Sequence, residues 1–242
     1  MWPFKKKVTD LGGAGLLTGF TDWHSHILPG VDDGVPTLDK SLAILDFYDK
    51  AGVKELWLTP HIMEDYPNTP ERLAERFAEL KEAYKGPIKL NLAAEHMLDS
   101  LFQERLDEKR VMPIGKEGNH LLVETSYFNP PMDFDTMIEE IFSAGYFPLL
   151  AHPERYRYMD EAKYESLRER GVLFQMNFIS LVGGYGTLAQ SKAEWLLKKG
   201  MIDVLGSDVH RLEVVTNMVT AAPRKNEHLE RLLEVASKPR IS

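Results

Sequence analysis

The segment Phe20-Thr-Asp-Trp-His-Ser-His-Ile27 places two histidines at the end of a short apolar run. Six further short runs follow along the chain. Most of them are rich in Val, Ile, Leu, Phe or Trp, as the buried strands of parallel sheets are. We therefore expect seven strands, at residues 20–27, 55–61, 88–95, 120–124, 147–152, 172–177 and 203–208.

Amphipathic stretches fill the gaps between these runs, and most of them end at a glycine. Glycine supplies the left-handed residue that commonly ends a helix, and Thr69-Pro70 is typical of a helix start. Helices are expected within residues 36–52, 69–86, 135–145, 160–171 and 187–200, with one or two more, interrupted at Pro223, in 212–242. This alternation predicts an α/β fold built from repeated βα units.

No change of composition marks a domain boundary. We expect residues 20–242 to form a single domain. Residues 1–19, which contain a cluster of glycines, are expected to form a flexible lead-in. The alternative of two small α/β domains would need a linker, and the sequence offers none.

Composition excludes several classes of chemistry. The chain has 242 residues, a formal charge of −8 and no cysteine. It therefore has no disulfide, thiolate zinc site, iron–sulfur cluster or cysteine nucleophile. The acidic balance argues against a general nucleic-acid binder, although a local basic patch stays open. No apolar run reaches the ~18 residues of a membrane span, and the start does not resemble a secretory signal, so we expect a cytoplasmic protein.

Imidazole and carboxylate side chains stand at the ends of six of the seven expected strands. Positions 24, 61, 95, 124, 152 and 208 are separated by 37, 34, 29, 28 and 56 residues, and the last interval spans two βα units. In a barrel of parallel strands, all the carboxyl ends lie on the face where active sites are built. The spacing therefore predicts that these side chains meet in one pocket.

The residue types at these positions favour metal ions. His24 and His26 are two apart on a strand, so both point to one face. A lone histidine at a strand end is more often a hydrogen-bonded residue of the core or rim, but six matching strand ends favour a metal site. Several carboxylates in one pocket repel each other unless cations offset their charge. Five histidines and four carboxylates exceed the ligands of one ion, so two or three ions are implied.

Aromatic side chains follow several of these strand ends. Tyr127 and Tyr185 are candidates for the rim of a substrate pocket. Packing on the barrel rim is an equally good interpretation of both.

The segment Asp22-Trp-His-Ser-His-Ile-Leu-Pro-Gly-Val-Asp-Asp-Gly34 resembles the first motif of the PHP superfamily of metallo-phosphoesterases. More narrowly, it is similar to the PHP-type protein tyrosine phosphatases of bacterial capsule and exopolysaccharide loci. Later motifs of the family match in order at residues 59–63, 94–95, 122–124, 151–155 and 207–210. The resemblance extends from about residue 20 to 212 and implies a distorted (β/α)7 TIM-like barrel.

The resemblance also implies a site of three ions. The first would be held by His24, His26, Glu95 and Asp208; the second by Glu95, Glu124 and His152; and the third by Asp33, His61 and His210. The choice of Asp33 over its neighbour Asp32 rests on the family pattern. Mn²⁺ is the first expectation for the metal, with Fe and Zn as alternatives.

The resemblance and the positions of the residues together indicate roles around these ions. Arg155, Asp208 and His210 are expected to act in catalysis, and Arg155, Arg211, Tyr127 and Tyr185 in substrate binding. Arg211 lies close to the position of a second family arginine but is offset from it. A hydroxide between two ions is expected to attack phosphorus in line, with a phenol of pKa ~10 as the leaving group.

The implied substrate is a phosphotyrosine protein, and the implied partner is the tail of an autophosphorylating tyrosine kinase of polysaccharide export. Two alternatives stay open. One is another PHP phosphoesterase, such as a histidinol-phosphate phosphatase, because it also acts on a phosphate monoester. The other is a non-catalytic scaffold that binds a phosphotyrosine tail. The sequence leaves the oligomeric state open.

Overall fold

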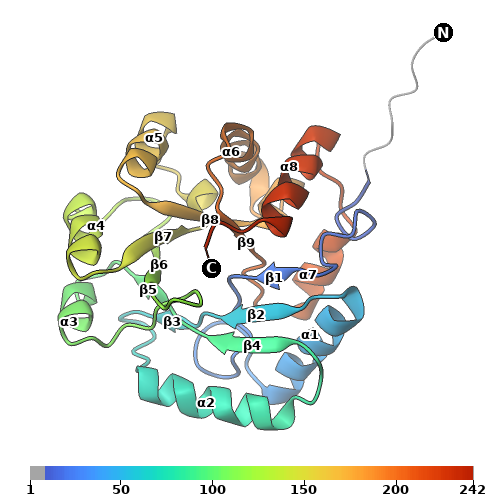
Figure 1. Ribbon diagram of the computed structural model, residues 1–242, viewed down its shortest axis with the longest axis horizontal. Helices are drawn as coiled ribbons and strands as arrows, with labels where there is room; N and C mark the ends of the chain where they lie inside the picture. Colours follow the sequence, from blue (N-terminus) through green and yellow to red (C-terminus); the bar gives the residue numbers. More distant parts are fainter. Residues whose placement is uncertain (1–8, 242) are drawn as a thin grey trace.

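Parallel strands form the centre of the computed structural model, which describes residues 9–241 (Figure 1). Within this range nine strands pair in two sheets, ordered β1-β2-β4 and β3-β5-β6-β7-β8-β9. Every pair of neighbouring strands is parallel. Their bounds are β1 Thr21–Asp22, β2 Glu55–Leu58, β3 His61–Ile62, β4 Lys89–Leu92, β5 Glu95–Met97, β6 His120–Glu124, β7 Phe147–Ala151, β8 Leu173–Asn177 and β9 Val204–Gly206.

Backbone hydrogen bonds connect the two sheets into one curled parallel structure. The nitrogen of Ala93, between β4 and β5, donates to the carbonyl of Leu58 at the end of β2 at 2.9 Å, and the nitrogen of Glu95 in β5 donates to the carbonyl of Pro60, just before β3, at 3.1 Å. On the other side, the nitrogen of Trp23 donates to Leu205 at 3.1 Å, and Ser25 bridges to Val209. Each of the seven segments expected to be strands therefore includes at least one strand. Two of them, 55–61 and 88–95, are each divided into two short strands.

Helices surround this central structure (Figure 1). They are α1 Leu38–Ala51, α2 Pro70–Ala83, α3 Phe102–Asp107, α4 Phe134–Ser143, α5 Glu161–Glu169, α6 Gly186–Lys199, α7 Leu212–Val219 and α8 Asn226–Ser237, with 3₁₀ turns η1 Pro153–Arg155 and η2 Phe178–Val182. The side chain of Thr69 accepts a hydrogen bond from the nitrogen of Arg72, as expected for a helix start. Gly52 ends α1 with a φ of 90°, as its left-handed role requires. The sequence did not predict α3, η1 or η2.

The core has two parts. A large cluster fills the space between the strands and the helices. A smaller one includes Trp23 and Trp57, whose rings stack 5.9 Å apart, together with Ile241 near the end of the chain. Because neighbouring residues of a strand point to opposite sides, the burial of Trp23 helps to fix the direction of His24.

The packed part of the chain begins before residue 20. Leu11, Leu16 and Leu17 are buried, and the nitrogen of Leu11 donates to the carbonyl of Ala221 at 3.1 Å. The part of the expected lead-in from residue 9 onward is therefore packed against the segment after α7, and residues 1–8 lie outside the described range. Across residues 9–241, no helix combines the length and the apolar character needed to cross a bilayer.

Candidate metal centre

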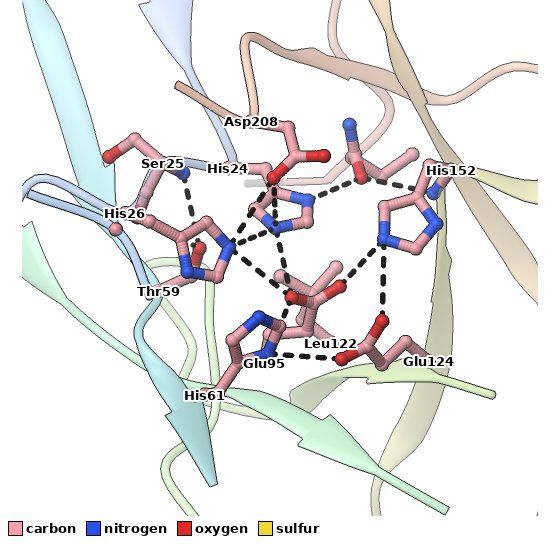
Figure 2. Close-up of polar contacts among 12 residues, drawn as sticks. His24, Ser25, His26, Thr59, His61, Glu95, Leu122, Glu124, His152 and Asp208 are labelled. Atoms are coloured by element: carbon pink, nitrogen blue, oxygen red, sulfur yellow. Dashed lines mark hydrogen bonds and ion pairs between the residues drawn. The ribbon is translucent and has the colours of Figure 1, made fainter. Parts of the chain in front are cut away.

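Buried imidazoles and carboxylates meet at one end of the curled sheet, where some of them follow or end a strand and His61 and Glu95 begin the short strands β3 and β5. Figure 2 shows them pointing toward one another from different strands. The nine residues whose donor atoms group together are His24, His26, Asp33, His61, Glu95, Glu124, His152, Asp208 and His210. These are the nine ligands expected from the family pattern. Seven of them are buried, whereas the side chains of Asp33 and His210 are 51% and 27% exposed.

His24 and His26 form the centre of this group. Their Nε2 atoms lie 3.0 Å apart. The Nδ1 of His24 contacts Oε1 of Gln175 at 2.8 Å, and the Nδ1 of His26 contacts Oδ2 of Asp32 at 2.9 Å. Because both partners are acceptors, the hydrogen-bond network assigns the proton of each neutral ring to Nδ1. When both rings are neutral, as metal binding requires, two lone pairs face each other in a buried site, and a cation between them would stabilise this arrangement.

Carboxylate oxygens complete this centre. Oε2 of Glu95 lies 3.3 Å from the Nε2 of both His24 and His26, and it is a buried oxygen without a hydrogen bond within the described chain. Oδ1 of Asp208 lies 3.4 Å from His26 Nε2. Ions with bonds of about 2.1 Å hold neighbouring ligand atoms about 3.0–3.4 Å apart. The donor set and its spacing therefore fit a divalent metal.

The grouping differs in detail from the three expected sets. His26 lies with Asp33, His61 and His210 as well as with His24 and Asp208. The Nδ1 of His61 lies 3.0 Å from Oε1 of Glu124, which was expected at a different ion. Residues expected at different ions therefore lie within one group at the centre of the site, so the three expected sets are not separate in space.

The buried carboxylates of the site favour positive charge beside them, either as protons on histidines or as bound cations. Burial lowers the pKa of His24, but the carboxylates of Glu95 and Asp208 outweigh it and raise that pKa to about 10. Burial raises the pKa of Asp208, but the nearby His24 and His26 outweigh this effect and hold that pKa below its ordinary value. Without a metal, protons on the imidazoles offset the carboxylates, and divalent ions would replace those protons.

Asp32 and Asp33 have different surroundings. Asp32 contacts His26 on the ring side away from His24, and it accepts a hydrogen bond from the nitrogen of His61 at 3.0 Å. Oδ1 of Asp33 instead lies 3.4 Å from His61 Nε2 and 3.5 Å from His210 Nε2. This geometry supports Asp33 as a candidate ligand and Asp32 as the group that orients His26.

Arg155 lies beside the metal ligands, in the 3₁₀ turn that follows β7. Its Nη1 is 2.8 Å from Oδ2 of Asp208. Its guanidinium lies between two aromatic rings, 4.2 Å from the centre of Tyr127 and 4.0 Å from that of Tyr185. These residues, together with Arg211, line a cleft of 440 Å³ that opens onto the ligands. Tyr127 and Tyr185 thus contact the arginine directly, and stacking restricts its orientation.

Two of the candidate ligands have strained backbones. His152 and Asp208 have φ angles of 33° and 53°, a region that residues other than glycine rarely adopt. Such strain is typical of functional sites, where the surrounding structure maintains it. Close approach also matters at Gly206, because a Cβ there would clash with His24 and Gln175.

Sequence reasoning missed the polar groups behind the ligands. Gln175 contacts His24, and Nδ2 of Asn177 donates to Oδ2 of Asp208 at 2.8 Å. Glu154 is buried, and burial raises its pKa to about 7. The sequence did contain a pattern that indicates Gln175 and Asn177, because they are two residues apart on a strand predicted to be buried and so point to the same face. Polar residues on the inner face of such a strand indicate a hydrogen-bonding role.

Comparison with known proteins agrees with this site. Residues 20–228 match the family described as "Capsular polysaccharide synthesis, CpsB/CapC". The chain belongs to the CpsB/CapC family. This confirms the capsule-locus family predicted from the sequence motifs.

Two relatives illustrate how far the similarity extends. This CpsB/CapC member is 29% identical over 205 residues to tyrosine-protein phosphatase CpsB of Streptococcus pneumoniae, covering 79% of this chain and 83% of that one. It is 26% identical over 198 residues to tyrosine-protein phosphatase YwqE of Bacillus subtilis, covering 79% and 78%. Crystal structures of YwqE and CpsB, described as unique metal-dependent tyrosine phosphatases, include a chain that superposes with a TM-score of 0.73 at 21% identity, over 92% of this chain and 98% of that one.

Proposed function

We propose that this CpsB/CapC member is a metal-dependent protein tyrosine phosphatase. The observation that carries the proposal is the convergence of nine histidine, aspartate and glutamate residues beside the partly buried Arg155. The named activity of the relatives supports it. So does the absence of cysteine, because the thiolate route to phosphotyrosine hydrolysis is closed in this chain.

The grouped residues would hold two or three divalent ions, with Mn²⁺ the first candidate and Fe or Zn as alternatives. When bound, such ions supply a water of lowered pKa as nucleophile and offset the negative charge of the phosphoryl group. Asp32 and Gln175 orient His26 and His24 through their Nδ1 atoms. Imidazole direction is thereby set before any ion arrives.

Arg155 would bind the phosphoryl oxygens. Its stacked position between Tyr127 and Tyr185 leaves the guanidinium with few alternative orientations, so little entropy is lost when it binds phosphate. Arg211 lines the same cleft and is a second candidate for phosphate contact. His210 and Asp208 lie at the junction of the metal ligands and this cleft.

The proposal extends to the setting of the enzyme. The substrate would be a phosphotyrosine protein in the cytoplasm, with a tyrosine kinase of polysaccharide export as the partner. We also propose that β2 with β3, and β4 with β5, count as single interrupted strands, so that the curled parallel sheet would correspond to the distorted (β/α)7 barrel expected from the sequence.

Hydrolysis of p-nitrophenyl phosphate tests the proposal. We expect activity in the purified protein, its loss after metal removal by a chelator, and its recovery on adding Mn²⁺. His24→Ala should remove most of kcat. His120→Ala is the matched control, because His120 lies at the opposite end of β6 from Glu124. Full activity after verified metal removal, or in His24→Ala, would refute the proposal.

A comparison of two substrates distinguishes a tyrosine phosphatase from the alternative, a histidinol-phosphate phosphatase. Rates on phosphotyrosyl peptides and on histidinol phosphate should be compared in the same metal-loaded protein. We expect the peptides to have the higher kcat/KM. A clear preference for histidinol phosphate would replace the phosphotyrosine assignment while leaving the metal centre intact.

A further inference from the structure

A second cavity adjoins the cleft of the metal centre. It has a volume of 810 Å³, against 440 Å³ for the cleft, and it lies between the loop 32–36, α1 and the start of α7. Asp33, His210 and Arg211 line both spaces. The two spaces therefore adjoin, and we call the larger one the α1–α7 groove.

The walls of the α1–α7 groove combine apolar and cationic groups. Its apolar lining includes Val35, Ile44 and Leu212. Lys40 and Arg211 contribute positive charge, and Glu213 contributes a carboxylate. The other two carboxylates of the lining, Asp32 and Asp33, are occupied by histidines of the metal centre. This leaves two cationic groups against one carboxylate.

We propose that the α1–α7 groove binds the polypeptide segment next to phosphotyrosine in a protein substrate, with an acidic side chain of that segment paired to Lys40. The inference rests on the proposed function. A phosphoryl group and its ring would fill the cleft, and the chain leading away from them would lie in the groove that adjoins it at Asp33, His210 and Arg211. The groove's volume falls within the about 300–1,000 Å³ typical of ligand pockets.

The occupant follows from the lining. Apolar walls accept the side chains of a peptide, and the surplus positive charge complements an acidic residue. Lys40 lies in the first turn of α1 and is exposed, so its pairing with an acidic residue would change selectivity more than chemistry. Small phosphate esters reach only the cleft and would not sense Lys40.

The test compares substrates of different size and charge. Three phosphotyrosyl peptides, identical except for acidic, neutral or basic residues flanking the phosphotyrosine, are assayed beside p-nitrophenyl phosphate. For the wild type we expect kcat/KM to be highest for the acidic peptide. Lys40→Glu should lower kcat/KM for the acidic peptide by about three- to tenfold and raise it for the basic one. Hydrolysis of p-nitrophenyl phosphate should not change.

Two further variants sharpen the test. Ala43→Phe places bulk in the groove, and we expect it to raise KM for every peptide by at least about fivefold with no effect on p-nitrophenyl phosphate. Lys50→Glu is the matched control, because Lys50 lies near the other end of α1, where it pairs with Asp46. Lys50→Glu should leave kcat/KM unchanged for all three peptides and for p-nitrophenyl phosphate.

Each other result overturns a defined part of the inference. Loss of p-nitrophenyl phosphate hydrolysis in the wild-type, metal-loaded protein would refute the proposed function and the groove's role with it. If p-nitrophenyl phosphate is hydrolysed but Lys40→Glu and Ala43→Phe do not change the kinetics on the peptides, the groove's role in peptide binding is refuted and the proposed function stands. Equal losses on peptides and on p-nitrophenyl phosphate would assign the groove to the phosphate site. An altered oligomeric state with unchanged selectivity would assign this face to a second copy of the chain.

Discussion

Gln175 provides a direct test of how the ligand histidines are oriented. Its side chain is fully buried, and Oε1 contacts two groups of the metal centre. The first is Nδ1 of His24 at 2.8 Å, and the second is the backbone nitrogen of His152 at 3.2 Å. We expect Gln175→Leu to weaken both the fold and metal binding, because one acceptor serves two ligand residues.

The size of the effect follows from these contacts. Each buried donor left without an acceptor costs about 1–3 kcal/mol, so the loss of both bonds gives a lower bound of about 2 kcal/mol. For a chain of this length that corresponds to a fall in Tm of about 4–8 °C. Removing the group that orients a metal-ligating histidine typically lowers metal affinity by about 10- to 100-fold. Gln175→Glu keeps an acceptor for His24 and should retain more of that affinity.

Calorimetry of the metal-free protein measures the first effect, and titration against a chelator of known affinity measures the second. Gln190→Leu is the control. Gln190 is another buried glutamine, in α6, and its Nε2 donates to the carbonyl of Leu181 at 2.8 Å. It should lower Tm without changing metal affinity. Wild-type metal affinity in Gln175→Leu, or an equal loss in Gln190→Leu, would refute the reasoning.

Three further outcomes are expected. Arg155→Ala should lower kcat/KM on p-nitrophenyl phosphate by about 10²–10³-fold, and Arg155→Lys should recover little of it, because lysine lacks the planar group held between Tyr127 and Tyr185; wild-type kinetics would rule out the phosphate role. Gly206→Ala should destabilise the metal-free protein by about 1–3 kcal/mol in denaturant titrations, since its Cβ would clash with His24, and an unchanged midpoint would contradict this close approach. Treatment with a thiol-alkylating reagent should leave activity intact, whereas chelation abolishes it; sensitivity to alkylation would contradict a mechanism without cysteine.

The sequence predicted the fold class and the side chains that group together at the site because both depend on local patterns. Apolar runs and glycine stops follow from burial and from left-handed helix ends, and the ligands stand where those runs end. His24, Glu95 and His152 could therefore be found without knowing their contacts. Their meeting in one site then followed from the rule that parallel strands share a direction.

The features that the sequence did not predict depend on distant contacts. The run 55–61 is divided at Pro60, whose missing N–H is a local signal, whereas the division of 88–95 at Ala93 and Ala94 has no such signal. The positive φ angles of His152 and Asp208 are maintained by surrounding groups rather than by the preference of either residue. Packing of Leu11 and its neighbours onto the body likewise depends on the segment after α7, more than 200 residues later in the chain.

Asp208 connects the metal centre to the candidate phosphate site through its two oxygens. Oδ1 lies 3.4 Å from Nε2 of His26, on the side of the ligands. Oδ2 receives hydrogen bonds from Arg155 at 2.8 Å, Asn177 at 2.8 Å and Tyr185 at 2.9 Å. A carboxylate held by three donors on one oxygen has little freedom to turn, so the other oxygen stays directed at the imidazoles. The same contacts that aim Arg155 at the cleft therefore also fix a candidate metal ligand, so a substitution at either site should change binding at the other.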